Sequence, residues 1–86
     1  MNIRFHKHFE KRYKKLRKGE KEKVLTAMAQ FGKNPFDPIL KNHPLRGAAS
    51  GKRSFSAAHD LRIIFEEFDG YILVIMLDVG THIQVY

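Results

Sequence analysis

The sequence predicts an α+β fold: a two-helix hairpin packed on one face of a small, mainly antiparallel four-stranded sheet, in the chain order β-α-α-β-β-β. Three observations predict it. Apolar residues recur at helical spacing in the first third of the chain, whereas its last third carries strand-forming apolar runs. The pair Asp69-Gly70 between two such runs is typical of a hairpin turn. The length predicts one domain spanning residues 1–86. The chain contains no cysteine, so we expect its stability to come from the apolar core alone or from a core that a partner completes.

The most apolar segment is the C-terminal run Tyr71 to Leu77. Apolar residues occupy both faces of this run, which predicts a central strand covered on both sides. Its β-branched and aromatic residues favour a strand over a short buried helix. Residues 83–86 are expected to extend this strand. The other predicted strands are residues 2–6, 52–57 and 61–67.

Two helices are expected between the first and second strands. The first runs from His8 and ends at Gly19, where a left-handed backbone suits glycine. The second begins at about Glu20 and ends before Asn34-Pro35. Residues 36–50 show no periodicity and predict a loop, and loops of this length tend to be functional or mobile. The apolar stripes of the two helices are Phe9, Tyr13 and Leu16, then Val24, Leu25, Met28 and Phe31.

The net charge of +7 is unevenly distributed. Residues 1–23 carry ten Lys or Arg against three acids, whereas residues from 60 onward carry five acids and one base. This asymmetry favours a polyanionic partner, with nucleic acid ahead of a membrane surface or an acidic protein; the alternative is a solvated helix face. We expect a cytoplasmic protein without a membrane partner, because no apolar run is long enough for a membrane span or a secretion signal. No glycine-rich phosphate loop or metal-ligand spacing occurs, so we expect neither metal nor cofactor.

Five polar residues are candidates for chemistry. His43 lies in the long loop, Asp60 and Arg62 begin the third strand, and His82 and Tyr86 follow the last one. Counting outward from the hairpin turn places Asp60 and Arg62 opposite the end of the last strand. We therefore expect these groups at one corner of the sheet, within reach of the loop that carries His43. The alternative is that each polar group only caps a strand end.

These residue types suit the cleavage of RNA without a metal ion. The ribose 2′-OH is the nucleophile, a base removes its proton, a cation stabilises the charge on the phosphorane, and an acid protonates the leaving 5′-oxygen. Histidine serves in either proton role near neutral pH, and the planar guanidinium of arginine suits a phosphate. Tyrosine can stack on a base or donate a proton. DNA lacks the 2′-OH, so this chemistry would spare it.

Several segments resemble the RelE/YafQ superfamily of type II toxin–antitoxin mRNA interferases, with the YafQ-like branch closest. The segments are HPLRG at residues 43–47, RSF at 53–55, DLRIIF at 60–65, and GTH at 80–82 with Tyr86. Together with the basic helical region, the resemblance covers almost the whole chain.

The resemblance implies a RelE-like fold and an endoribonuclease that inhibits translation by cutting mRNA in the ribosomal A site, without a metal. It implies that the basic helices meet ribosomal RNA, and that a cognate antitoxin wraps the toxin, giving a toxin–antitoxin hetero-oligomer.

The matching catalytic positions are His43, Asp60, Arg62, His82 and Tyr86. We assign His82 as the leading candidate for general acid or base and His43 as the second candidate. Asp60 would act as a base or orient a histidine, Arg62 would stabilise phosphorane charge, and Tyr86 would stack on a base. The expected RNA-binding residues are Lys41, Arg46, Lys52 and Arg53.

Two positions depart from the family pattern. Ser56 stands where YafQ-like members carry a further histidine, and Asp78 stands where they often carry an arginine. These departures leave a second hypothesis, a weakened toxin that binds antitoxin or RNA without cutting. A third is a ParE-like gyrase inhibitor, which shares the fold and would not need the pair His43 and His82.

Overall fold

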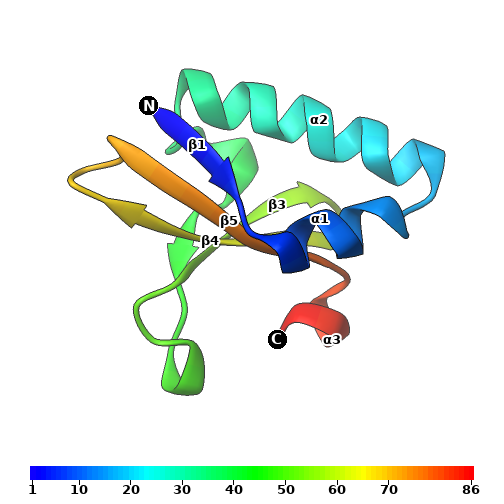
Figure 1. Cartoon of the computed structure of the whole chain (residues 1–86). Helices are drawn as coiled ribbons and strands as arrows, with labels where there is room; N and C mark the ends of the chain where they lie inside the picture. The colour runs from blue at the N-terminus through cyan, green and yellow to red at the C-terminus, as the bar shows by residue number, and fades with distance from the viewer.

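A computed structural model describes all 86 residues, which form two layers of helices and sheet with a short third helix beneath (Figure 1). The five strands follow the order β1-β5-β4-β3-β2, with β1 parallel to β5 and the other pairs antiparallel. The elements are β1 (Asn2–Phe5), α1 (Lys7–Lys14), α2 (Lys18–Lys33), η1 (Pro38–Leu40), β2 (His43–Pro44), η2 (Gly47–Ala49), β3 (Arg53–Ala58), β4 (Leu61–Phe68), β5 (Leu73–Gly80) and α3 (His82–Val85).

The predicted α+β class, with a helix pair on a mainly antiparallel sheet, is confirmed. The predicted number of strands is wrong, because the segment expected to be a loop contains β2, which pairs with β3 and makes a fifth strand. A two-residue strand containing a proline gives no periodic signal, so only its partner strand reveals it.

An aromatic core joins the helices to one face of the sheet. Phe31 of α2 is fully buried and stacks on Phe55 of β3 at 4.6 Å between ring centroids. It also meets Phe65 of β4 edge-on at 5.0 Å. Phe9 of α1 belongs to the same cluster. The opposite face of the sheet, here called the open face, carries the short helix α3, which folds beneath β4 and β5 (Figure 1).

The boundary between the two long helices differs from the prediction. Gly19 lies in the first turn of α2, not at the end of α1. The carboxylate of Glu20 accepts a hydrogen bond from the backbone N–H of Arg17 at 2.9 Å, which starts α2 one residue before the glycine. The helix α1 is capped by His6, whose Nδ1 accepts from the backbone N–H of His8 at 3.0 Å.

A β-bulge interrupts β5 and explains its apolar pattern. Val74, Met76 and Val79 are all fully buried although they do not share parity. Met76 and Asp78 pair with adjacent residues of β4, so Leu77 is the extra residue that changes the phase. The prediction of two covered faces was therefore wrong: the strand is interior in the sheet, but its other face is only half-buried.

The hairpin between β4 and β5 turns where it was predicted, but the turn is longer. Phe68 pairs with Leu73, which leaves residues 69–72 in the loop. Asp69, Gly70 and Tyr71 all have positive φ, at 54°, 64° and 70°. The backbone N–H of Tyr71 donates to the Glu67 carboxylate at 3.0 Å, which holds this unusual backbone.

The last residues form a helix, so the predicted strand extension over residues 83–86 is wrong. Thr81 and Gln84 make a capping box: the Thr81 N–H donates to Gln84 Oε1 at 2.9 Å, and the Gln84 N–H donates to Thr81 Oγ1 at 3.3 Å. This local chemistry starts α3, which packs against β4 and β5.

Candidate functional site

The pairing of the strands determines which side chains meet on the open face. In antiparallel sheets, directly opposed residues point to the same side. His43 of β2 is opposite Ser54 of β3, and Ser54 is opposite Ile64 of β4. Phe55, the neighbour of Ser54, points into the core on the other side. The open face therefore carries His43, Ser54 and Ile64 in one row.

Arg62 lies in the next row, at the corner of the sheet. It is opposite Ser56 and Gly80, so the predicted pairing with the end of the last strand is confirmed. Its Nη1 donates to the carbonyl oxygens of Ala58 at 2.9 Å and His59 at 3.1 Å, and to Ser56 Oγ at 3.3 Å. These bonds hold a half-buried guanidinium beside the turn between β3 and β4. A fixed cation in this position suits a phosphate.

The short helix α3 brings His82 and Tyr86 together. Tyr86 N–H donates to the carbonyl of His82 at 3.0 Å, and the two rings meet edge-on at 4.3 Å between centroids and 77° between planes. The backbone N–H of His82 approaches Asp60 Oδ1 at 3.4 Å. Asp60 thus holds the backbone at the start of α3, and all three residues lie near the corner that Arg62 occupies.

Ser54 connects α3 to the row on the sheet. The Tyr86 hydroxyl donates a hydrogen bond to Ser54 Oγ. Since His43 is opposite Ser54, a continuous chain of neighbours runs from His43 through Ser54 and Tyr86 to His82. Ser54 belongs to the segment RSF quoted above, but the sequence does not predict its contact with Tyr86, because that contact depends on both the register of β3 and the direction of α3.

The imidazole of His43 is held in one tautomer. Its Nδ1 lies 2.7 Å from the carbonyl oxygen of Lys41. A carbonyl oxygen only accepts, so the proton of the neutral ring is on Nδ1 and the lone pair is on Nε2. Lys41 presents this carbonyl from a left-handed backbone with φ of 52°, which costs a non-glycine residue of the order of 1 kcal/mol. The arrangement leaves Nε2 able to accept a proton.

Three of the four predicted RNA-binding residues lie along the segment that carries His43. Lys41 precedes β2, and Arg46 and Lys52 flank the hairpin loop between β2 and β3, which projects from the body of the molecule (Figure 1). Arg53 is different: it shares the parity of core residue Phe55, and its Nε donates to Asn42 Oδ1 at 2.9 Å. The structure therefore does not bring Arg53 to the open face.

Asp78, the charge reversal noted in the sequence, is paired with helix α1. Its Oδ1 lies 3.3 Å from His8 Nε2 and 3.8 Å from Arg12 Nη1, and it accepts from the Val79 N–H at 2.8 Å. Arg12 also reaches Gly80, where a Cβ atom would lie 2.7 Å from Nη2. Arg12, which the sequence alone did not single out, is thus next to the turn that leads into His82.

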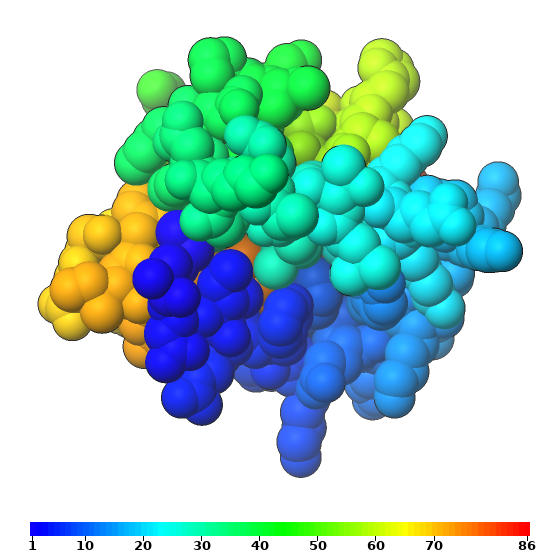
Figure 2. All heavy atoms as spheres, turned by 90° about the horizontal axis from the view of Figure 1, so that it is seen from above, coloured from blue at the N-terminus to red at the C-terminus, as the bar shows by residue number.

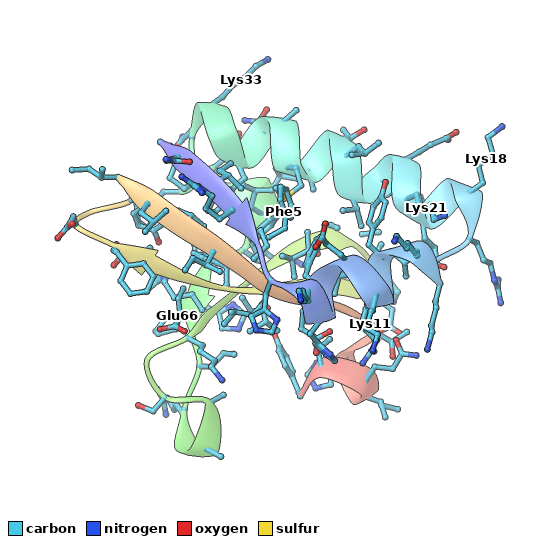
Figure 3. The ribbon with its side chains drawn as sticks, in the orientation of Figure 1. Phe5, Lys11, Lys18, Lys21, Lys33 and Glu66 are labelled. Carbon is cyan, nitrogen blue, oxygen red and sulfur yellow. The ribbon has the colours of Figure 1, made fainter.

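The helices carry most of the remaining basic charge. Lys18 and Lys33 extend from α2 away from the sheet, and Lys11 lies on α1 (Figure 3). None of the helices combines the length and the apolar character needed to cross a bilayer.

An apolar groove of about 280 Å³ separates α1 from α2 on the side away from the open face. Figure 2 shows the hollow between the blue β1–α1 segment and the cyan α2. Two of its lining side chains are well exposed, Phe5 at 48% and Leu25 at 60%. Its other lining residues are Phe9, Glu10, Tyr13, Lys14, Val24 and Met28.

Comparisons with known proteins identify a family over the whole chain. The family described as "Bacterial toxin of type II toxin-antitoxin system, YafQ" matches residues 1–86. A search of curated proteins finds no match. The structure is similar to that of YafQ from E. coli strain BL21(DE3), with 25% sequence identity, a TM-score of 0.82, and coverage of 99% of this chain and 97% of that chain.

Two further solved structures are similar. A chain of the E. coli DinJ–YafQ toxin–antitoxin complex has 25% identity and a TM-score of 0.79, with 99% and 96% of the two chains covered. A YoeB/ParE toxin from Agrobacterium tumefaciens shares the fold at 16% identity and a TM-score of 0.77, with 95% of this chain and 99% of that chain covered.

Proposed function

Because this chain belongs to the YafQ family of bacterial type II toxin–antitoxin toxins, we propose that it is an endoribonuclease that cuts mRNA on the ribosome. The observation that carries the proposal is the convergence of two histidines, an arginine and a tyrosine at the open face. His43 and His82 are linked through Ser54 and Tyr86, and Arg62 is fixed at the adjoining corner.

Each group has a role that fits its geometry. His43 Nε2 carries the lone pair, so His43 acts as the base that takes the proton from the ribose 2′-OH. The 2′-oxygen attacks phosphorus while the bond to the 5′-oxygen breaks, and protonated His82 gives its proton to that oxygen. The products are a 2′,3′-cyclic phosphate and a 5′-hydroxyl. Arg62 stabilises the charge of the phosphorane, because its guanidinium is already oriented and loses little freedom on binding. Tyr86, 48% exposed, offers a ring face for a base.

Asp60 holds the site rather than reacting. Its carboxylate faces the backbone N–H of His82, and no hydrogen bond joins it to an imidazole ring. Of the two roles considered for this residue, orientation of a histidine is the one that its contact supports.

The ribosome is proposed as the surface on which cleavage occurs. Lysines on α1 and α2 point to solvent, and the hairpin with Arg46 and Lys52 projects on the side of the site (Figures 1 and 3). A net charge of +7 on 86 residues favours binding to folded RNA, whose phosphates attract such a surface.

A cognate antitoxin is the proposed protein partner. The comparison structures include toxin–antitoxin complexes, DinJ–YafQ from E. coli and RelBE2 from Mycobacterium tuberculosis. In this chain, the groove between α1 and α2 exposes Phe5 and Leu25 and is bordered by a second hollow lined by Lys7, Glu10, Lys11 and Lys14. Apolar side chains of an acidic antitoxin segment would fill the groove while its carboxylates face the lysines.

Primer extension on mRNA in a purified translation reaction tests the function. The wild-type protein should leave discrete cuts in the message, and His82→Ala should reduce them by about 100-fold or more, because it removes a proton donor. His59→Ala is the matched control, since His59 is an exposed histidine in the neighbouring turn whose side chain has no assigned role. It should cut like the wild type.

The same reaction separates the alternatives. A weakened toxin would bind antitoxin or RNA and leave the message whole. A gyrase inhibitor would leave mRNA and translation intact while causing DNA damage. Cutting by His82→Ala at the wild-type rate would remove His82 from the reaction.

A further inference from the structure

Ser54 and Tyr86 form a hydroxyl pair that joins the sheet to the end of α3. Ser54 is the only buried residue with a polar side chain, and its exposed fraction is 0%. A hydroxyl that is buried this completely needs a hydrogen-bond partner. Tyr86 supplies one through its own hydroxyl. The pair therefore satisfies the only polar side chain in the interior and links it to a residue of the proposed site.

The helix α3 depends on contacts of this kind. It has four residues, His82–Val85, and a helix of one turn is not stable on its own. Its start is held by the capping box of Thr81 and Gln84 and by the carboxylate of Asp60. Among the side-chain hydrogen bonds of this segment, only the one between Tyr86 and Ser54 reaches its C-terminal end.

We propose that Ser54 is a positioning residue that acts through Tyr86 on His82. The Tyr86 ring lies edge-on against the imidazole, 4.3 Å between centroids, so a Tyr86 ring that is held in place also restricts how the imidazole turns. Ser54 does not touch RNA itself, because it is fully covered. This inference rests on the proposed nuclease function, in which His82 must present its proton to the leaving oxygen.

Loss of either hydroxyl should have the same effect. Ser54→Ala and Tyr86→Phe both remove the hydrogen bond, and Tyr86→Phe keeps the ring. Each should lower kcat for mRNA cleavage by about 10- to 100-fold, the range expected for a misplaced proton donor, with KM changed by less than about twofold. The double variant should be no slower than the slower single variant, because the two hydroxyls act as one unit. Thr26→Ala, which removes a hydroxyl on α2 far from the open face, should leave kcat unchanged.

Nuclear magnetic resonance of the His82 ring gives a readout that does not depend on cleavage. In the wild type, the nearby Tyr86 ring displaces the His82 ring-proton shifts by its ring current, and both Ser54→Ala and Tyr86→Phe should move them toward the values of a free histidine. The His43 signals should change less, because its ring is held by the Lys41 carbonyl. Tyr86→Phe keeps the test valid if Ser54→Ala does not fold, since Tyr86 is half exposed.

Unchanged His82 shifts and unchanged kcat in both single variants would overturn the inference. Loss of cleavage in Ser54→Ala alone, with Tyr86→Phe fully active, would also overturn it, because serine would then act by another route. If the wild type cuts no mRNA, the proposed function fails. The chemical shifts of the His82 ring protons would still show whether the hydroxyl pair of Ser54 and Tyr86 fixes the orientation of the His82 imidazole.

Discussion

Replacing Gly80 with alanine should loosen α3 with little effect on the rest of the fold. Gly80 ends β5 directly before Thr81 and is buried. Its backbone φ is not positive, so an alanine is not strained by conformation. The obstacle is space: a Cβ atom would lie 2.6 Å from Gln84 Oε1, 2.7 Å from Arg12 Nη2 and 3.2 Å from Gln84 Cβ.

The expected cost follows from what must move. The Arg12 guanidinium is the far end of a flexible side chain and can turn away. Gln84 Oε1 cannot move without breaking its 2.9 Å bond from the Thr81 N–H, and Gln84 Cβ moves only with the helix. Loss of this half of the capping box costs about 1–2 kcal/mol. A free-energy change of 1.4 kcal/mol alters an equilibrium constant tenfold. The state in which α3 is locally unfolded should therefore become about tenfold more populated.

Amide hydrogen exchange and mRNA cleavage measure the two consequences. In Gly80→Ala, the amides of Val85 and Tyr86, which bond back to residues 81 and 82, should exchange about tenfold faster, and cleavage should fall. Gly32→Ala is the matched control: it lies in α2 with nothing within 4 Å of its Cβ position, so it should stabilise the protein by about 0.5–1 kcal/mol and leave cleavage unchanged. Wild-type exchange and cleavage in Gly80→Ala would refute the steric argument.

Two further substitutions examine the surroundings of the site. Asp78→Asn should lower the free energy of unfolding by about 0.5–1 kcal/mol, because it removes the partly exposed ion pair with Arg12 and weakens the contact with His8. Urea denaturation at low and high salt should show this difference shrinking as salt is added, and a salt-independent difference would contradict an origin in the ion pair. Leu25→Lys should weaken antitoxin binding by about 10- to 100-fold in a calorimetric titration, because it places a charge in the apolar groove, while mRNA cleavage stays the same. Thr26→Lys, outside the groove lining, should bind like the wild type, and equal loss in both variants would exclude the groove as the docking site.

Much of the fold was predictable because each long element carries its own periodic signal. Apart from the boundary between α1 and α2, the two long helices and the strands β3 and β4 lie in the segments where apolar spacing predicts them. The errors occur where a few residues decide the structure: Glu20 starts α2 before Gly19, Thr81 and Gln84 turn the expected strand end into a helix, and a proline-containing pair forms β2. Such local hydrogen bonds and partner strands leave no periodicity to detect.

The residues of the candidate site were predictable as residue types, and their connections were not. Hairpin counting placed Arg62 opposite the end of β5, because an antiparallel register follows from the turn. The link between His43 and His82 required Ser54, whose role depends on α3 folding back beneath the sheet. Arg53 was predicted to bind RNA, and it lies next to the site in sequence. Its side chain points to the other face of the sheet, because neighbouring residues of a strand alternate between the two faces.

The surplus residue Leu77 also has a consequence for sequence alignment of relatives. If Leu77 were deleted, Met76 and Asp78 would keep their present partners in β4. The hydrogen-bonded ladder would then be continuous, and the core residues of β5 would still face the core. A shorter relative would thus keep the same core, yet lose the local twist that a bulge adds. The helix α3 would then leave the sheet at another angle. An alignment gap of one position at Leu77 would therefore indicate a relative in which the residue matching His82 points in another direction.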